Sequence, residues 1–282
     1  MPPGIRLLLV DALNLIRRVY AAQPGEDGAE RAREGLESSL RSLGRALSEC
    51  EPTHAVAVFD GAGETWRHRL FGGYKADRKP MPEALADSLP RYVEAFAELG
   101  VQSFERPATE ADDVIATLAT KVDAVGGSAV ILATDKGYLQ LMSERIAVRD
   151  HFKHLNVGPG LVRERFGVGP ERLVDLIALA GDPTSSIGGV PGVGQKTAAK
   201  LLADWGSLAA ALEAADRSVA GQLPVAGPQL SPKLAQGLAA HAEDARLAWR
   251  LSGLVTDLEL GINLQDFRYR SREPPSSSPD LQ

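Results

Sequence analysis

The chain has 282 residues, of which 44% are hydrophobic, so it can bury a substantial core and does not have the composition of a disordered protein. Its net charge of -6 argues against a protein that binds nucleic acid through a uniformly basic surface. The single cysteine, Cys50, excludes an intramolecular disulfide and a cysteine-rich zinc site, and no apolar run reaches the roughly 20 residues of a membrane span, so we expect a cytoplasmic protein without a membrane partner.

Residues 5 to about 150 alternate short apolar, β-branched runs with helical patterns, which predicts an α/β fold with a mostly parallel sheet flanked by helices. The strand-like runs lie at 5–10, 55–59 and 129–134, and helical spacing covers 29–47, 83–99 and 110–125. From about 158 to 262, short helical patterns joined by glycine-rich turns predict a second, α-helical region. Residues 271–282 are rich in proline and serine, so we expect a disordered tail.

Each of the three strand-like runs leads into an aspartate: Asp11, Asp60 and Asp135. Because the carboxyl ends of parallel strands meet at one edge of a sheet, these side chains can converge there with Glu110-Ala-Asp-Asp113, which opens a predicted helix. Taken singly, each strand-end aspartate is equally well explained as a turn former or a helix cap, and complementing the helix dipole is an alternative role for the acids of 110–113. Together, so many carboxylates would raise one another's pKa unless a divalent cation neutralised them, which predicts a Mg²⁺ or Mn²⁺ site.

A basic segment follows the second strand. Between Arg67 and Lys79 there are five cationic residues against one acid, Asp77. A solvated surface is the common explanation of such a run. The cations are interleaved with Tyr74, however, which favours a mobile element that contacts a nucleic-acid backbone, with Tyr74 available to stack on a base.

The second motif is Gly189-Val-Pro-Gly-Val-Gly-Gln-Lys-Thr197, which precedes a helical run. Its glycines allow a tight turn whose following helix directs N–H groups at a phosphate, so we expect DNA-backbone contact that is independent of base sequence. A simple turn between helices and a nucleotide-binding P-loop are the alternatives. A P-loop requires glycine directly before the lysine, but Gln195 separates Gly194 from Lys196, so we expect no nucleotide cofactor.

In this order, the acids, Thr134-Asp-Lys136 and the glycine-rich hairpin resemble the bacterial 5′-nuclease family, which comprises flap endonucleases and the 5′ to 3′ exonuclease domains of DNA polymerase I. The closest resemblance is to a stand-alone branch, through the segments 10–18, 53–60, 66–68 and 134–138. The resemblance implies a PIN-like nuclease domain over 1–157 with a basic arch at about 64–95, and a helix-three-turn-helix DNA-binding region over 158–262. It further implies Mg²⁺-dependent cleavage of 5′ flaps on DNA during replication and repair, by an enzyme that we expect to be a monomer.

The resemblance also assigns residues. The acids around the metal are Asp11, Asp60, Glu110, Asp112, Asp113 and Asp135, with Asp112 as the expected direct ligand and Asp182 as an outer one. Lys75 and Arg78 face the scissile phosphate, accompanied by Tyr74. The DNA-contacting hairpin is Gly192, Val193, Gly194, Gln195, Lys196 and Thr197. A K⁺ is expected on the main-chain carbonyls of Leu179, Ala180, Gly188, Val190 and Val193.

Two positions depart from the family pattern. Gly137 and Ser185 stand where flap endonucleases usually carry acids of a second metal site, while Asp182 remains. Our hypothesis is that substrate phosphates and water hold most of a second ion, so that activity survives at reduced efficiency. Two other functions stay open: a DNA-structure-binding protein with weak or no nuclease activity, and a PIN-type ribonuclease, which would not ordinarily carry the helical region.

Overall fold

In the computed structural model, residues 4–153, 155–222 and 226–270 are described, and the predicted disordered tail lies outside them. The centre of the fold is a six-stranded sheet in the order β3-β2-β1-β4-β5-β6. Its strands are β1 (Arg6–Asp11), β2 (His54–Val58), β3 (Gln102–Phe104), β4 (Ser128–Leu132), β5 (Ile146–Asp150) and β6 (Leu155–Val157). All neighbours are parallel except β5 and β6, which confirms the predicted α/β fold with a mostly parallel sheet.

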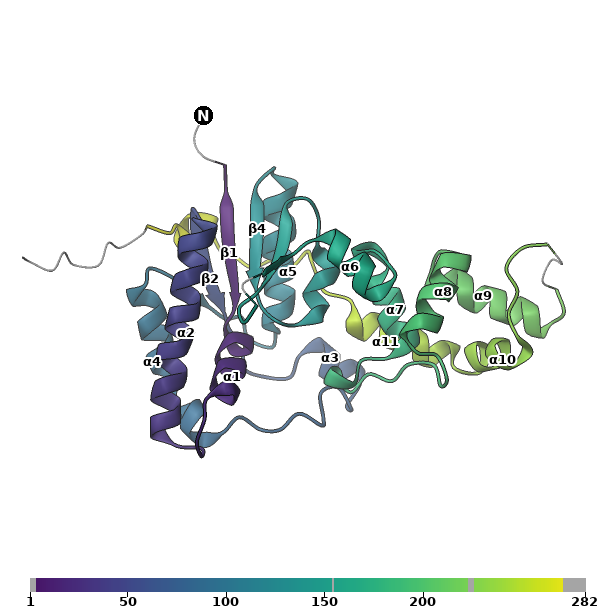
Figure 1. The fold of residues 1–282 in the computed structure, drawn as a ribbon, viewed down its shortest axis with the longest axis horizontal. Coiled ribbons are helices and arrows are strands. Elements are labelled where there is room, and N and C mark those ends of the chain that lie inside the picture. The colour runs from purple at the N-terminus through teal and green to yellow at the C-terminus, as the bar shows by residue number, and fades with distance from the viewer. Residues whose placement is uncertain (1–3, 154, 223–225, 271–282) are drawn as a thin grey trace, which may run out of the picture.

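Helices cover both faces of this sheet, which explains why its central strands read as unbroken apolar runs. Along β1, Leu8 and Val10 pack against α1 (Ala12–Ala22), α2 (Ala29–Cys50) and α4 (Glu83–Glu98). Leu7 and Leu9 point to the other face and join the cluster that contains α5 (Ala111–Ala124). The helices predicted over 29–47, 83–99 and 110–125 are therefore confirmed to within a few residues (Figure 1).

The helical region extends away from the sheet, as the green ribbons of Figure 1 show. It contains α6 (Pro159–Phe166), α7 (Leu173–Ala180), α8 (Gln195–Trp205), α9 (Leu208–Val219), α10 (Pro232–Ala240) and α11 (Ala242–Ser252). Its apolar side chains belong to the same cluster as α5, so the second half of the chain packs on the first. Within the described ranges, no helix has the length and hydropathy needed to cross a membrane.

Several short elements connect these layers. α3 (Trp66–Leu70) lies at the start of the basic segment. The described residues also form 3₁₀ helices: η1 (Lys136–Leu141), η2 (Pro170–Arg172), η3 (Pro183–Ser185) and η4 (Leu264–Phe267). Residues 75–77 of the basic segment contact the loop around η3. The Lys75 N–H donates to the Ser185 carbonyl at 3.1 Å, and the Ser186 hydroxyl donates to Asp77 at 2.9 Å. This contact brings the basic segment to the carboxyl edge of the sheet.

Candidate active site

Four aspartates that are distant in sequence line one cavity of about 260 Å³ at the carboxyl edge of the sheet: Asp11, Asp60, Asp112 and Asp135. Asp11 ends β1 and caps α1, Asp60 follows β2, and Asp135 follows β4 and caps η1. Asp60 Oδ1 also accepts a hydrogen bond of 2.8 Å from the Ala111 N–H at the start of α5. Asp11 and Asp135 therefore cap helices and line the cavity at the same time, so the capping role expected from the sequence does not exclude a role in the site.

These carboxyl groups disfavour one another's ionised forms. Burial, followed by the charges of Asp112 and Asp60, raises the pKa of Asp11 well above its usual value. Burial, followed by the charge of Asp112, also raises the pKa values of Asp60 and Asp135. The charge of Asp112 thus raises the pKa of each of the other three aspartates. The cavity therefore has the electrostatic character of a site that a cation stabilises.

Tyr138 is a member of this cluster that sequence reasoning did not select. Its hydroxyl lies 2.6 Å from Asp112 Oδ1 and 3.0 Å from Asp11 Oδ2, and its side chain is 1% exposed. Burial and then the charges of Asp11 and Asp112 raise the pKa of Tyr138 well above 10.0, so the hydroxyl remains a neutral donor. The available signal was its place on the turn that begins at Asp135, within the segment 134–138 that resembles the family.

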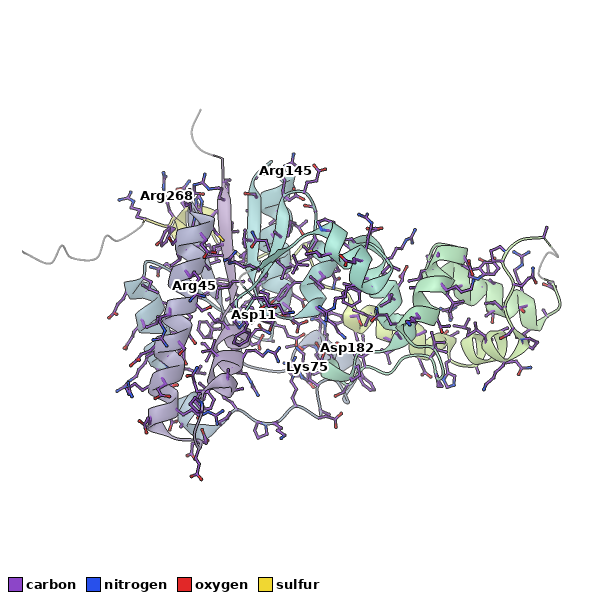
Figure 2. All side chains as sticks on the ribbon, viewed as in Figure 1. Asp11, Arg45, Lys75, Arg145, Asp182 and Arg268 are labelled. Carbon is purple, nitrogen blue, oxygen red and sulfur yellow. The ribbon has the colours of Figure 1, made fainter. Side chains whose placement is uncertain are left out.

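Cationic side chains line the same cavity. Lys75 Nζ lies 2.5 Å from Glu110 Oε1 and 3.9 Å from Asp112 Oδ2. Burial lowers the pKa of Lys75, but the charge of Asp112, followed by Tyr74 and Glu110, outweighs it and raises that pKa. Arg78 also lines the cavity, as predicted, together with three cations that were not selected as site residues: Arg17, Arg18 and Lys79. Figure 2 shows Asp11 at the lower end of the sheet in that view, with Lys75 labelled below it.

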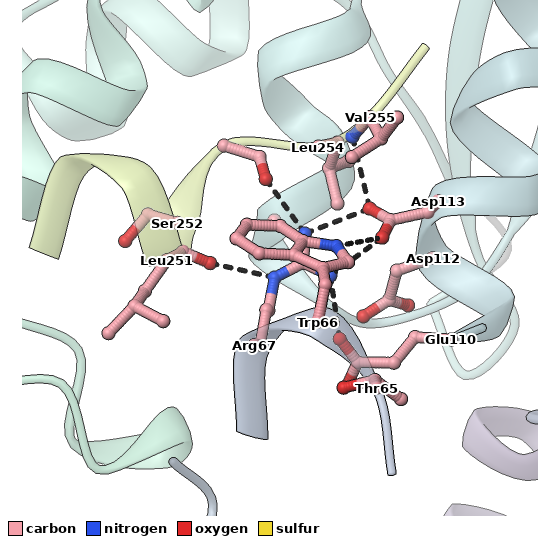
Figure 3. Close-up of polar contacts among 12 residues, drawn as sticks. Thr65, Trp66, Arg67, Glu110, Asp112, Asp113, Leu251, Ser252, Leu254 and Val255 are labelled. Carbon is pink, nitrogen blue, oxygen red and sulfur yellow. Dashed lines mark hydrogen bonds and ion pairs between the residues drawn. The ribbon is translucent and has the colours of Figure 1, made fainter. Parts of the chain in front are cut away.

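Arg67 connects two of the predicted metal-site acids to the helical region (Figure 3). Its guanidinium donates to both oxygens of Asp113 at 2.8 Å and to Glu110 Oε2 at 2.6 Å. It also donates to the main-chain carbonyls of Leu251 and Gly253 at 2.9 and 2.7 Å.

Asp113 has two further donors, the indole N–H of Trp66 at 2.9 Å and the main-chain N–H of Val255 at 3.0 Å. Every oxygen of Asp113 therefore accepts two hydrogen bonds, and both oxygens of Glu110 face cations. Neither acid lines the aspartate cavity. The structure thus separates these two residues from the four aspartates with which the sequence grouped them.

Tyr74 is the residue whose surroundings differ most from the expectation. Its ring is 5% exposed and packs edge-on against His68, with the ring centroids 5.4 Å apart. Its hydroxyl faces Glu110 Oε2 at 3.5 Å. The ring also belongs to the buried cluster that contains α5 and the helical region. A ring enclosed in this way is not presented to a base, so the stacking role suggested by the sequence does not fit this arrangement.

Asp182 lines a smaller cavity together with Asp135 and Lys75, and Figure 2 labels Asp182 beside Lys75. Its carboxylate accepts hydrogen bonds from the Thr184 hydroxyl at 2.7 Å and the Thr184 N–H at 3.2 Å, and Lys136 Nζ lies 2.7 Å from the same oxygen. Burial raises the pKa of Asp182, but the hydrogen bonds from Lys136 and Thr184 outweigh it and lower that pKa.

The glycine-rich hairpin connects α7 to α8. Gly192 has a φ of +80°, a left-handed conformation that favours glycine, and Gly194 forms the N-cap of α8 without a side-chain hydrogen bond. Gly192, Gly194, Gln195 and Lys196 are exposed, Thr197 is half-buried, and Val193 is buried and anchors the turn. The N-terminal N–H groups of α8 and Lys196 are therefore presented together on the surface.

The carbonyls predicted to hold K⁺ come from segments in direct contact. The Val190 N–H donates to the Leu179 carbonyl and the Val193 N–H to the Val190 carbonyl, each at 2.9 Å. A Cβ on Gly189 would lie 2.4 Å from the carbonyl carbon of Ala180, so the loop passes against the end of α7. The K⁺ site itself stays a prediction.

Comparisons with known proteins cover nearly the whole described chain. Residues 6–167 match the family described as 5′-3′ exonuclease, N-terminal resolvase-like domain, and residues 168–275 match its C-terminal SAM fold. Flap endonuclease Xni of Aliivibrio fischeri (strain MJ11) is 41% identical over 268 residues, which cover 94% of this chain and 96% of the relative. Flap endonuclease Xni of Vibrio parahaemolyticus is 42% identical, with coverage of 94% and 97%.

Solved structures of nucleases at low sequence identity share the fold. The T5 5′-exonuclease with bound divalent zinc ions superposes with a TM-score of 0.69 at 22% identity, covering 89% of this chain and 90% of that one. The catalytic core of Rad2 in complex with a DNA substrate superposes with a TM-score of 0.62 at 14% identity, covering 95% and 83%.

Proposed function

The chain belongs to the 5′-3′ exonuclease family, and from this premise we propose that it is a structure-specific nuclease that cleaves 5′ flaps on DNA by Mg²⁺-dependent phosphodiester hydrolysis. Membership confirms the resemblance drawn from the ordered motifs. The observation that carries the proposal is the cavity in which four aspartates from three strand ends and α5 lie beside Lys75 and Arg78. Its acids suit a divalent ion, and its cations suit a phosphate.

A divalent ion fits this cavity through its water shell. Among the described residues, no group of three or more acids converges closely enough to hold an ion directly. Mg²⁺ keeps several waters and often has only one or two carboxylate ligands, so we propose Asp112 as the direct ligand, with Asp11, Asp60 and Asp135 acting through water. When bound, the ion supplies Lewis-acid activation of the phosphoryl group and a bound water of lowered pKa. Mn²⁺, which also prefers oxygen ligands, is the expected substitute.

The remaining residues of the site position the substrate and the acids. Lys75 and Arg78 bind the non-bridging oxygens of the scissile phosphate, and the contact of Lys75 with Glu110 holds its ammonium beside the aspartates. Glu110 and Asp113 act through Lys75 and Arg67, because their oxygens are already hydrogen-bonded. This assignment differs from the expectation that these two acids belong to the group around the metal.

DNA is bound outside the catalytic cavity by the hairpin before α8. Exposed Lys196 and the free N-terminal N–H groups of α8 suit a phosphate, and none of them reads a base edge, so binding is independent of sequence. A K⁺ held by the carbonyls at the α7 junction would fix the hairpin against the end of α7. One copy of the chain carries one hairpin and one aspartate cavity, which together suffice for one flap, so we propose a monomer.

One observation favours a second candidate, a DNA-structure-binding protein with little or no nuclease activity. Gly137 and Ser185 lie beside Asp135 and Asp182 and contribute no carboxylate to that side of the site. A protein with the hairpin and basic segment but without effective chemistry would still recognise branched DNA.

A single set of assays separates the candidates. A labelled 5′-flap DNA, its RNA counterpart and a gapped duplex are each incubated with the protein, with and without Mg²⁺. Nuclease activity predicts Mg²⁺-dependent cleavage of the flap DNA near its junction, whereas Asp112→Asn binds the flap and leaves it intact. If wild type and Asp112→Asn bind equally and neither cleaves, the DNA-binding candidate is correct. Preferential cleavage of the RNA would identify a ribonuclease.

A further inference from the structure

Asn14 lies at the boundary between the aspartate cavity and a neighbouring cavity of about 560 Å³, and it was not selected as a site residue from the sequence. It is the third residue of α1, in the turn that Asp11 caps. Its main-chain N–H donates to Asp11 Oδ1 at 3.0 Å, so this cap forms without the Asn14 side chain. At this position of a helix a side chain often reaches back to the main chain of the cap residue. The Asn14 side chain extends instead to the end of the neighbouring strand, β4.

The partner of the Asn14 side chain is Thr134, which immediately precedes Asp135. Asn14 Oδ1 accepts the Thr134 main-chain N–H at 2.9 Å and the Thr134 hydroxyl at 3.0 Å. The preceding main-chain N–H, that of Ala133, still donates to a carbonyl of β5, at Arg149. Asn14 therefore supplies the acceptor that the main-chain N–H of Thr134 needs where the sheet ends.

These bonds fix the orientation of the Asn14 amide and link two aspartates. A main-chain N–H can only donate, so the amide oxygen and not the amide nitrogen faces Thr134. Asn14 and Thr134 are both half-buried, which limits competition from water for the two bonds. The side chain thus connects the turn that holds Asp11 to the turn that holds Asp135.

This link opposes the repulsion between the two acids. Asp11 and Asp135 line the same cavity, and as ions they repel each other. Turns at strand ends have fewer main-chain hydrogen bonds than the strands themselves, so repulsion displaces them more readily. A link between the two turns keeps the carboxylates together before an ion arrives, and pre-formed ligands bind a metal more tightly than ligands that must first be ordered.

We propose that Asn14 is a positioning residue of the divalent-metal site, which acts through Thr134 to hold Asp11 and Asp135 across the cavity. This inference rests on the proposed nuclease function and names a residue on which its metal binding depends. Asn14 affects the ion through the two aspartates and not by direct contact. Removal of such an outer hydrogen-bonding partner typically weakens metal binding or activity by about 10- to 100-fold.

The primary measurement is the Mn²⁺ affinity of the full chain without DNA, obtained from the electron paramagnetic resonance signal of free Mn²⁺. Asn14→Ala removes both bonds to Thr134 and should weaken Mn²⁺ binding by roughly tenfold or more. Thr134→Val keeps the main-chain N–H but lacks the hydroxyl, so the loss should be roughly two- to fivefold, as for one ordinary hydrogen bond. The double variant should bind Mn²⁺ within about twofold of Asn14→Ala, because the contact is already absent there.

Asn263→Ala is the matched control. Asn263 Oδ1 also accepts a main-chain N–H, that of Gln265 at 2.9 Å, but it does so at η4. The residue after η4, Arg268, pairs with His54 at the amino end of β2, on the sheet edge opposite to the aspartates. This variant should lose a helix cap and keep the Mn²⁺ affinity of wild type. Thermal unfolding with a chelator gives the stability of each variant, so a general loss of stability is separated from a loss of metal binding.

Flap cleavage provides a second measurement. In Asn14→Ala, the Mg²⁺ concentration for half-maximal cleavage should rise by the same factor as the Mn²⁺ dissociation constant. At saturating Mg²⁺, the KM for flap DNA should stay within about twofold of wild type, because independent sites do not affect each other more than this. A raised KM with unchanged Mn²⁺ affinity would make Asn14 a DNA contact and overturn the positioning role.

The remaining outcomes separate this inference from the proposed function. Wild-type Mn²⁺ affinity in Asn14→Ala, or losses of the two single variants that multiply in the double variant, overturns the role of Asn14 and leaves the nuclease assignment intact. If Asn14→Ala does not fold, unchanged Mn²⁺ affinity in Thr134→Val decides against the inference. A wild-type chain that binds Mn²⁺ without cleaving flap DNA contradicts the nuclease function alone, and one that does not bind Mn²⁺ contradicts both.

Discussion

Replacing Arg67 with methionine tests whether one buried ion pair connects the nuclease half to the helical region. Arg67 is 1% exposed and donates five hydrogen bonds of 2.6–2.9 Å to Glu110, Asp113 and the carbonyls of Leu251 and Gly253. Methionine fills much of the space of the arginine stem but donates none of these bonds. Asp113 then keeps only its donors from Trp66 and Val255, and its charge stays buried without a cation.

Removing one partner of a buried ion pair typically lowers the free energy of unfolding by about 3–5 kcal/mol. The expected loss lies within that range because Glu110 retains Lys75, whereas Asp113 loses its only cationic partner among the described contacts. With a shift of roughly 2–4 °C per kcal/mol for a chain of this size, the unfolding temperature should fall by roughly 6–20 °C. The total stability of a typical domain, about 5–15 kcal/mol, still allows the variant to fold.

Urea unfolding followed by circular dichroism measures this loss, and thermal unfolding checks it. The matched control is Arg33→Met on α2, where the ion pair with Glu37 is 58% and 50% exposed. Such an exposed pair contributes at most about 1 kcal/mol. If Arg67→Met lost no more stability than Arg33→Met, the buried network would not be the connection that its geometry indicates.

Three further outcomes are expected. Burial and neighbouring acids raise the pKa of Asp11 above its usual 3.8, so the metal-free protein should lose stability as the pH rises from 3.8 through the raised folded value. Asp11→Asn, which keeps the cap on α1, should then be more stable than wild type at neutral pH but not in acid, as urea unfolding with a chelator measures; equal stability at neutral pH would count against the repulsion. Tyr138→Phe should lower the free energy of unfolding of the metal-free protein by about 1.5–3 kcal/mol, because a charged acceptor loses its donor; a calorimetric loss near zero would contradict this. Lys196→Gln should weaken flap binding equally for all sequences and reduce the salt slope by about 0.9 in fluorescence anisotropy, and an unchanged slope would rule out its phosphate contact.

Local sequence pattern determined the framework of this protein. The β-branched runs before Asp11, Asp60 and Asp135 predicted three parallel strands, and their shared direction was enough to place these aspartates at one edge of the sheet. The position of Asp112 in the first turn of α5 followed from helical spacing. The glycines around Val193 predicted the turn before α8, because a left-handed conformation at Gly192 is a property of the local backbone. These features depend on residues close together in the chain.

Tertiary structure alone decided which partner each charged group meets. Glu110 and Asp113 share a helix terminus with Asp112, but packing brings Arg67, more than forty positions earlier, onto their oxygens. The same packing encloses Tyr74, brings the Tyr138 hydroxyl to Asp112, and sets Lys136 against Asp182. A carboxylate can bind a metal, a guanidinium or an ammonium with similar local geometry. The choice among them depends on side chains brought together by long-range folding, which spacing along the sequence does not encode.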